Sequence, residues 1–519
     1  MKLIKILSDK VQIRTDNTEF KDIRINDLIS ISDDVVNLIT IVTSITDTDS
    51  GGALGEDDFI FENESIKTVE CSIIGSVRNG LFTKAIERYP VTDITAKKVS
   101  NDEFRGMLSG YEKEGFPIGD YAAYDCPAYV NGNKFFQRHA CIVGNTGSGK
   151  SETVARILEQ ASKLPGTNIV VFDIHGEYSR LSYARNIKIG SSFSFFPIWM
   201  FSFSNMVSDV LKVKEETASV VMSALRKCYY QLCPDGKENR PVRFDFMEMV
   251  NMMEHLNTEE VLTGEIYKTG DKAGMAKTVK GDFYGKLSGI INTMKDKLAD
   301  KRYAFLFEEE IQDYLGNMMH QIMDNDMPVK NIDLSDVPHD VAIPLIGVIT
   351  RLIYGIQRIY PQEEMIPITL VCDEAHVYIP NDFQLSASER RMVGTFEEIA
   401  KEGRKFGITL FPASQRPSEL NKTIMAQCAN FIVSKLNNEN DKSMIKGMLP
   451  EGDASVVDAT STFRPGEVLI IGDAVPIPLK IQVCLAKERP QSRTIDFWDE
   501  WSKGKRTSMD EAIKAYMNS

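Results

Sequence analysis

The run from Cys141 to Val154, "CIVGNTGSGKSETV", constrains the fold more than any other part of the chain. Apolar residues that suit a strand precede Gly144, and residues that suit a helix follow Lys150. The spacing Gly144-x-x-x-x-Gly149-Lys150-Ser151 lets backbone N–H groups and a helix N-terminus converge on phosphate oxygens. The sequence therefore predicts a strand, a phosphate-binding turn and a helix, which together begin an α/β sheet domain.

This turn and the first helical residues form the predicted nucleotide site. Lys150 is expected to reach the β- and γ-phosphates, and the Ser151 hydroxyl is expected to ligate Mg²⁺. The predicted cofactor-binding residues are Gly144, Asn145, Thr146, Gly147, Ser148, Gly149, Lys150, Ser151 and Glu152.

A second apolar run, "ITLVCDEAH", ends in Asp373 and Glu374. Ligands of parallel α/β sheets bind at the carboxyl ends of the strands, so both carboxylates are expected near the phosphate-binding turn. Asp373 is predicted to hold Mg²⁺ through water, and Glu374 is predicted to polarise the attacking water. A solvated strand end explains an isolated Asp-Glu pair more simply, but the turn at Gly144 makes hydrolysis the better interpretation.

Two further strand ends carry polar residues. Gln415 ends "GITLFPASQ", where it either senses the γ-phosphate or is an ordinary loop amide, and spacing does not choose between the two. Asp173, His175 and Glu177 follow "NIVVF", and they suit a metal site, a supporting role beside the metal shell, or a turn at Gly176 with polar neighbours. Because no second ligand cluster completes a metal site, the last two alternatives are favoured.

Arginines are the remaining candidates for catalysis. In a ring ATPase, an arginine that reaches a neighbour's γ-phosphate stabilises the charge of the transition state. Arg138 precedes the first strand and Arg404 lies in "EEIAKEGRKFG", on a helix predicted to begin with a capping box from Ser386 to Glu389. Surface salt bridges are the alternative, and spacing alone favours them.

The charge balance limits the partners. The 519 residues carry a net charge of -14, which argues against nucleic-acid affinity over the whole surface but allows a local basic channel. Residues 268–302 carry nine basic and four acidic side chains and are a candidate DNA contact, although a solvated helical face explains them as well. The basic residues are Lys268, Lys272, Lys277, Lys280, Lys286, Lys295, Lys297, Lys301 and Arg302.

Strand and helix patterns divide the chain into segments. Short Val-, Ile- and Thr-rich runs near the start predict a small β-barrel, and alternating strands and helices predict a parallel sheet. The predicted segments are a barrel at 1–95, the first part of the sheet domain at 96–199, a helical insertion at 200–335, the second part of the sheet domain at 336–486, and a tail at 487–519. The tail is predicted to dock on another surface. The longest apolar run, "VAIPLIGVITRLIYGI", contains Arg351 and is predicted to be a buried helix. No signal peptide or membrane contact is expected, so the predicted location is cytoplasmic.

Taken together, these motifs resemble those of the HerA ATPases, which are grouped with FtsK-type translocases. The resemblance rests on "RHACIVGNTGSGKSETV", "VVFDIHGEYSRL", "LVCDEAHVYIP", "EEIAKEGRKFGITLFPASQRPSEL" and "PGEVLIIGDAVPIPLKIQV", in that order. It implies an α/β fold, a RecA-like P-loop ATPase core with a helical insertion, preceded by a small N-terminal β-barrel.

The resemblance also implies a function. A hexameric ring is expected to move double-stranded DNA, using ATP and Mg²⁺, together with an effector such as a NurA-like nuclease or a sirtuin-like NAD-consuming enzyme, in DNA processing or antiphage defence. The alternatives are a ring that binds ATP to scaffold an effector with little translocation, and a protein-remodelling ATPase.

By the same resemblance, Lys150 and Ser151 bind ATP and Mg²⁺, and Asp373 coordinates the metal. The implied catalytic residues are Glu374 as the base, Gln415 as the γ-phosphate sensor, and Arg138 and Arg404 as arginine fingers. The second arginine assignment falls alternatively on Arg390 or Arg391.

Overall fold

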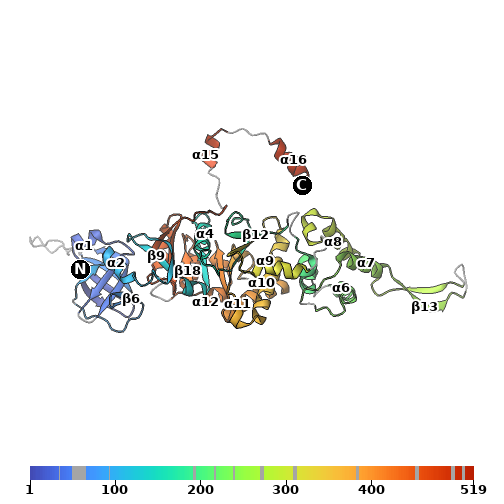
Figure 1. Cartoon of the computed structure of the whole chain (residues 1–519), viewed down its shortest axis with the longest axis horizontal. Helices are drawn as coiled ribbons and strands as arrows, with labels where there is room; N and C mark the ends of the chain where they lie inside the picture. Colours follow the sequence, from blue (N-terminus) through green and yellow to red (C-terminus); the bar gives the residue numbers. More distant parts are fainter. Residues whose placement is uncertain are drawn as a thin grey trace, which may run out of the picture.

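The computed structural model describes residues 1–33, 36–48, 66–92, 94–190, 195–214, 218–237, 240–268, 274–307, 313–381, 385–449, 455–491, 497–504 and 509–518. A small antiparallel barrel lies at one end of the elongated molecule, and a two-stranded hairpin extends from the other end (Figure 1). The sheet domain lies between them.

The barrel strands follow the order β1-β2-β5-β4-β3-β7, with β6 paired to β5. Alternate residues such as Val11 and Ile13 point inward and are buried, as expected for strands with one apolar face. The edge strands meet at a bridge between Lys2 and Thr95, so the sheet closes on itself and the predicted barrel is confirmed. The strands are β1 Lys2–Ile6, β2 Lys10–Thr15, β3 Leu28–Ser32, β4 Asn37–Thr48, β5 Ile66–Arg78, β6 Leu81–Thr83 and β7 Ala96–Lys98.

The sheet domain is built on an 11-stranded mixed sheet of order β12-β15-β11-β16-β17-β10-β18-β19-β20-β8-β9. The strands from β12 to β18 are parallel, and the rest pair antiparallel. The α/β fold is therefore confirmed. The strands are β8 Gly115–Tyr121, β9 Pro127–Asn131, β10 Ala140–Val143, β11 Ile169–Asp173, β12 Ala184–Lys188, β15 Val329–Asp333, β16 Ile368–Cys372, β17 Ile408–Ser414, β18 Asn430–Val433, β19 Glu467–Gly472 and β20 Lys480–Val483.

Helices complete the sheet domain. Helix α4 follows the phosphate-binding turn, and α10 packs against α11. Helix α10 is long and apolar enough to cross a membrane by length and composition alone, but 56% of its most apolar stretch is buried inside the protein, as predicted for a core helix. The main helices are α2 Asn101–Leu108, α3 Gly132–Phe136, α4 Lys150–Ala161, α10 His339–Ile359, α11 Ala387–Glu402, α12 Lys422–Gln427 and α13 Glu439–Lys446.

The segment predicted as a helical insertion is helical only in part. Helices α6 Ser219–Leu232, α7 Phe246–Thr258 and α8 Ser288–Ala299 pack in sequence, and α9 Tyr314–Met323 follows. However, β13 Glu260–Ile266 and β14 Ala276–Lys280 form the protruding hairpin, and β15 joins the central sheet (Figure 1). The strand pairing across the sheet, which local periodicity does not show, places β15 in the core rather than in the insertion.

The two described helices of the tail, α15 Phe497–Ser502 and α16 Asp510–Asn518, stand clear of the body (Figure 1). Trp498 and Trp501 of α15 are 80% and 72% exposed. The predicted docking of the tail stays a prediction.

Candidate nucleotide-hydrolysis site

Polar residues gather where neighbouring parallel strands end. The phosphate-binding turn follows β10, Gln415 follows β17, Asp373 follows β16, and Asp173 ends β11. These four strands are adjacent in the sheet, so their carboxyl ends form one edge. The structure therefore brings together the turn, the predicted acidic pair and the predicted sensor.

The turn is shaped by close backbone approach. A Cβ on Gly144 would lie 2.6 Å from the Cβ of Ser434, and Gly149 has a φ of +95° with Gly466 N only 2.9 Å from its Cβ position. Gly147 also has a positive φ, of 74°. Glycine alone fits these positions without strain, and Gly149 caps the N-terminus of α4. The result is a concave run of backbone opening onto a helix N-terminus.

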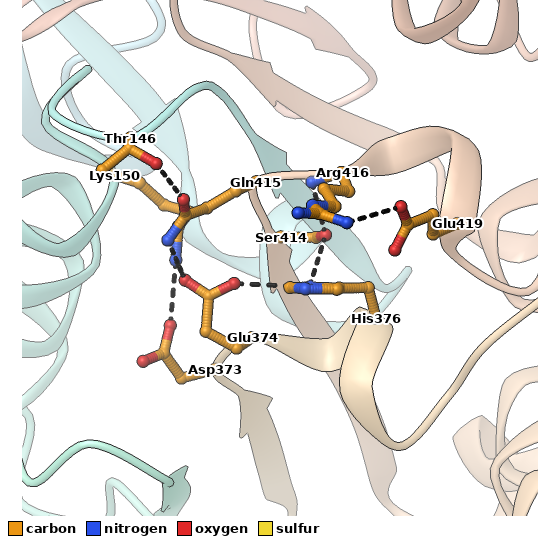
Figure 2. Close-up of polar contacts among 9 residues, drawn as sticks. All are labelled: Thr146, Lys150, Asp373, Glu374, His376, Ser414, Gln415, Arg416 and Glu419. Atoms are coloured by element: carbon orange, nitrogen blue, oxygen red, sulfur yellow. Dashed lines mark hydrogen bonds and ion pairs between the residues drawn. The ribbon is translucent and has the colours of Figure 1, made fainter.

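Lys150 projects from α4 between the two predicted acidic residues (Figure 2). Its Nζ lies 3.1 Å from Asp373 Oδ1 and 3.0 Å from Glu374 Oε1. All three side chains are at most 6% exposed. The cation and the two carboxylates therefore form a closed, buried ion triad.

Burial disfavours the charged form of Lys150, but the two carboxylates outweigh it and raise the pKa of the amine. Burial likewise acts to raise the pKa of Glu374, and Lys150 outweighs it, so the pKa of this carboxyl is lowered. Both residues are therefore charged at neutral pH, and the Lys150 amine is paired with anionic oxygens.

Gln415 connects the turn to the acidic pair. Its Nε2 donates to Glu374 Oε1 at 2.5 Å, and its Oε1 accepts a hydrogen bond from the Thr146 hydroxyl (Figure 2). An ordinary loop amide would not bridge these two groups. The geometry therefore supports the sensor interpretation, in which the amide lies between the turn and the carboxylate.

The second oxygen of Glu374 has a different environment. Oε2 is buried, and no aligned hydrogen-bond donor contacts it within the described part of the chain. His376 Nδ1 lies 3.3 Å from it, and burial lowers the pKa of this imidazole. The two oxygens of Glu374 therefore have different partners.

Asp173 and Glu177 lie on the other side of the triad. Asp173 is fully buried and accepts hydrogen bonds from the backbone N–H groups of Glu177 and Tyr178 and from the Asn331 amide. Burial raises the pKa of Asp173 to about 6. Burial also raises the pKa of Glu177, and a hydrogen bond with the Ser151 hydroxyl opposes that shift.

His175 is exposed and does not join this group. Asp173, His175 and Glu177 therefore do not form one metal site. Glu177 lies beside the predicted Mg²⁺ ligand Ser151, and Asp173 holds the loop backbone through its hydrogen bonds. In the described ranges, no group of three or more His, Cys, Asp and Glu side chains is arranged to hold a metal by itself.

The hydrogen-bond donors and oxygen ligands at this edge of the sheet fit a nucleoside triphosphate with Mg²⁺. The glycine turn leaves no room for side chains, the helix N-terminus points into it, and a buried cation lies beside two carboxylates. Ser148 supplies a further buried hydroxyl without a hydrogen-bond partner in the described chain. Hydroxyl and carboxylate oxygens such as those of Ser151 and Asp373 are the ligands that Mg²⁺ prefers.

The predicted arginines do not lie at this edge. Arg138 precedes β10 and Arg404 precedes β17, so both lie at the amino edge of two adjacent parallel strands, opposite the phosphate-binding turn. Arg138 Nη1 pairs with Asp473 at 2.5 Å, and both side chains are about half exposed. Arg404 is exposed. Neither Arg138 nor Arg404 reaches the nucleotide site of the same chain.

The candidate DNA contact is divided between the hairpin and α8. Among its described basic residues, four have acidic partners: Lys277 with Glu265, Lys295 with Glu254, Lys297 with Asp340, and Arg302 with Asp300. Lys280 lies over the Tyr284 ring at 4.5 Å. Lys272 lies outside the described residues. The DNA contact stays a prediction.

His376 and Ser414 were not predicted to take part, although "DEAH" and "ASQ" contain them. His376 lies on a short 3-10 helix, Ala375–Val377, and its Nδ1 is 3.2 Å from Ser414 Oγ (Figure 2). Nothing in the local spacing indicates this contact, because it joins the ends of two different strands.

The fold and site define a P-loop ATPase. Residues 116–353 match the family model described as "Helicase HerA, central domain". This part of the chain is therefore similar to the HerA central domain.

Similarity to curated HerA proteins extends over most of the chain. A "DNA double-strand break repair helicase HerA" of Sulfurisphaera tokodaii is 26% identical over 82% of this chain and 79% of its own length. A protein of the same description from Pyrococcus furiosus is 22% identical over 89% of this chain and 85% of its own length. The solved structure of VirB4 from Thermoanaerobacter pseudethanolicus has the same core fold, with a TM-score of 0.50, 14% identity, and coverage of 72% of this chain and 97% of that chain.

Proposed function

We propose that this protein hydrolyses ATP in a homo-hexameric ring that moves double-stranded DNA. The observation that carries the hydrolysis step is the buried Glu374 carboxylate, whose Oε1 is held by Lys150 and Gln415 at the edge that carries the phosphate-binding turn. Once a nucleotide draws these two partners away, Oε1 can take a proton from water.

The roles of the residues follow from their positions. The turn from Gly144 to Gly149 binds the phosphate chain, and Lys150 leaves the carboxylates to contact the β- and γ-phosphates. Ser151 and Asp373 would hold Mg²⁺, which would neutralise charge on the phosphate oxygens. Glu374 takes the proton of the attacking water, and Gln415 senses the γ-phosphate by exchanging its hydrogen bond to Glu374 for a contact with the phosphate.

The positions of Arg138 and Arg404 support the proposal of a ring. Arg138 and Arg404 lie at the amino edge of the sheet, whereas the nucleotide site lies at the carboxyl edge. If the amino edge of one subunit faces the carboxyl edge of the next, these side chains reach the neighbour's γ-phosphate, where positive charge stabilises the transition state.

DNA as the substrate is supported by the similarity to proteins described as DNA double-strand break repair helicases. We further propose a cytoplasmic location and an effector partner, such as a NurA-like nuclease or a sirtuin-like NAD-consuming enzyme, in DNA processing or antiphage defence. The exposed tryptophans of α15 supply an apolar surface for such a partner.

The test measures ATP hydrolysis by the purified protein with and without duplex DNA, alongside movement on a DNA substrate. A DNA-dependent increase in rate, together with movement that requires ATP, is expected. An equal rate in both conditions without movement would show that the protein is not a translocase.

An ATP-dependent scaffold is the second candidate, favoured by the net charge of -14 and the exposed tail. The Glu374→Gln variant separates the two, because it keeps the nucleotide cradle but lacks the base. Effector activity that survives in this variant supports a scaffold, and its loss supports a motor.

A further inference from the structure

Three elements converge on Glu374, and they hold its two oxygens differently. Oε1 contacts Lys150 from α4 and Gln415 from the end of β17. Oε2 contacts His376, which lies two residues further along the chain. The two oxygens of Glu374 therefore have different partners, and a bound nucleotide would affect these partners differently.

Under the proposed function, both partners of Oε1 are recruited by the nucleotide. Lys150 turns to the phosphates, and Gln415 turns to the γ-phosphate. The His376 ring points toward Glu374, and its Nδ1 also lies close to Ser414 Oγ (Figure 2). It is therefore the contact that remains when Oε1 is released.

The backbone of Glu374 adds a reason for such support. Its φ is +45°, in the left-handed region that a glutamate rarely adopts. Such conformations are strained and persist only when surrounding contacts hold them. A fixed neighbour at Oε2 keeps the carboxylate aimed at the site.

His376 is itself well anchored. Its Nδ1 lies 3.2 Å from Ser414 Oγ, and this hydroxyl also accepts a hydrogen bond from Arg416 N at 3.0 Å. Ser414 is fully buried, and it is followed directly by Gln415. A single ring nitrogen thus links the strand end that carries the catalytic carboxylate to the strand end that carries the sensor.

We propose that His376 is a positioning residue, which holds Glu374 Oε2 and the Ser414–Gln415 strand end in register for the attack of water. A carboxylate neighbour favours the tautomer with the proton on Nδ1, so that the N–H lies between Oε2 and Ser414 Oγ. The residue transfers no proton in this role. The inference rests on the proposed hydrolysis of ATP.

The test compares His376→Ala, His376→Asn and His376→Gln. The Asn amide lies close to the position of Nδ1, whereas the Gln amide lies close to that of Nε2. We expect His376→Ala to lower kcat for ATP hydrolysis about 10-fold or more with KM and nucleotide Kd within 2-fold, His376→Asn to recover part of the rate, and His376→Gln to recover none.

His320→Ala is the matched control, because His320 is 74% exposed and pairs only with Asp324 on its own helix in the described chain. It should keep the wild-type kcat. An unchanged kcat in folded, nucleotide-binding His376→Ala, or equal rates for the Asn and Gln variants, would overturn the proposal. Failure of the proposed function is distinct, since wild type itself would then hydrolyse no ATP.

Discussion

Lys150 Nζ lies 3.0 Å from Glu374 Oε1, so the group expected to bind phosphate is held by the group expected to activate water. Asp373 holds the same amine at 3.1 Å. Under the proposed function, nucleotide phosphates displace the carboxylates from Lys150, and this exchange would release Glu374 for catalysis. Binding and activation would then be coupled through a single cation.

The first prediction concerns the base. Glu374→Gln removes the carboxylate that accepts the proton but keeps an oxygen for Gln415, so kcat for ATP hydrolysis should fall by about 100-fold or more. Nucleotide affinity should be equal or higher, because a neutral amide competes less strongly for Lys150. Equilibrium binding of a fluorescent ATP analogue and steady-state hydrolysis measure both. A variant that hydrolyses ATP at the wild-type rate would exclude Glu374 as the base.

The second prediction concerns the ion triad. Lys150→Ala leaves two buried carboxylates without their cation, and removal of one partner from a buried ion pair costs about 3–5 kcal/mol. The free energy of unfolding of the nucleotide-free protein should fall by about 3 kcal/mol, and nucleotide binding should be lost.

Urea denaturation measures this change. Lys446→Ala is the control, since its partner Asp458 is 59% exposed and such surface pairs contribute about 0–1 kcal/mol. Equal stability of Lys150→Ala and wild type would contradict a buried triad.

The third prediction concerns Arg138. If this side chain acts on a neighbouring subunit, Arg138→Ala and Glu374→Gln proteins are each inactive, but mixed rings contain sites with an intact Glu374 and an intact Arg138. Mixing them should therefore restore part of the ATPase activity. Absence of recovery at every mixing ratio would leave Arg138 with its role in the Asp473 pair alone.

Asp473→Ala is the matched control for that experiment. It breaks the same exposed ion pair, which contributes about 0–1 kcal/mol, while leaving the guanidinium free. Its activity should stay at the wild-type level. A loss as large as that of Arg138→Ala would assign the effect to the ion pair.

The fourth prediction concerns pH. The pKa of Asp173 is raised from 3.8 to about 6, so the folded protein binds a proton that the unfolded chain has already lost between these pH values. Stability from this group is therefore greatest below about pH 4 and falls as pH rises to about 6, by about 3 kcal/mol in total.

Asp173→Asn does not titrate. The free energy of unfolding of wild type relative to this variant should therefore fall by about 2 kcal/mol between pH 4 and pH 7. Urea denaturation of both proteins across this range gives the difference, in which the other titrating groups cancel. A difference that does not change with pH would contradict the raised pKa.

Features that depend on neighbours in the chain were predictable. The predicted capping box from Ser386 to Glu389 is present, and Met392 and Phe396 form part of the buried apolar face of the same helix. The apolar run around Arg351 forms the buried helix α10. Periodicity and capping are local properties, so a single sequence carries them.

Features that depend on pairing were not predictable. The β13–β14 hairpin lies in the segment predicted as a helical insertion, and the prediction also assigns β15 to that segment rather than to the sheet. Both strands of the hairpin are almost entirely exposed, so they lack the alternation of buried and exposed residues that marks a strand. The fifth residue of β15, Asp333, lies beside Asp173 only because the two strands pair.

The sequence by itself determined the chemistry of the carboxyl edge. A glycine turn followed by Lys150, and apolar strands followed by Asp373-Glu374 and Gln415, predict a phosphate cradle with a carboxylate for hydrolysis beside it. Only the tertiary structure decided how these groups contact one another. Strand order places β17 between β16 and β10, and that order brings Glu374 and His376 beside Ser414 and leaves Arg138 at the opposite edge. Strand order depends on the burial of the whole sheet, which no local stretch encodes.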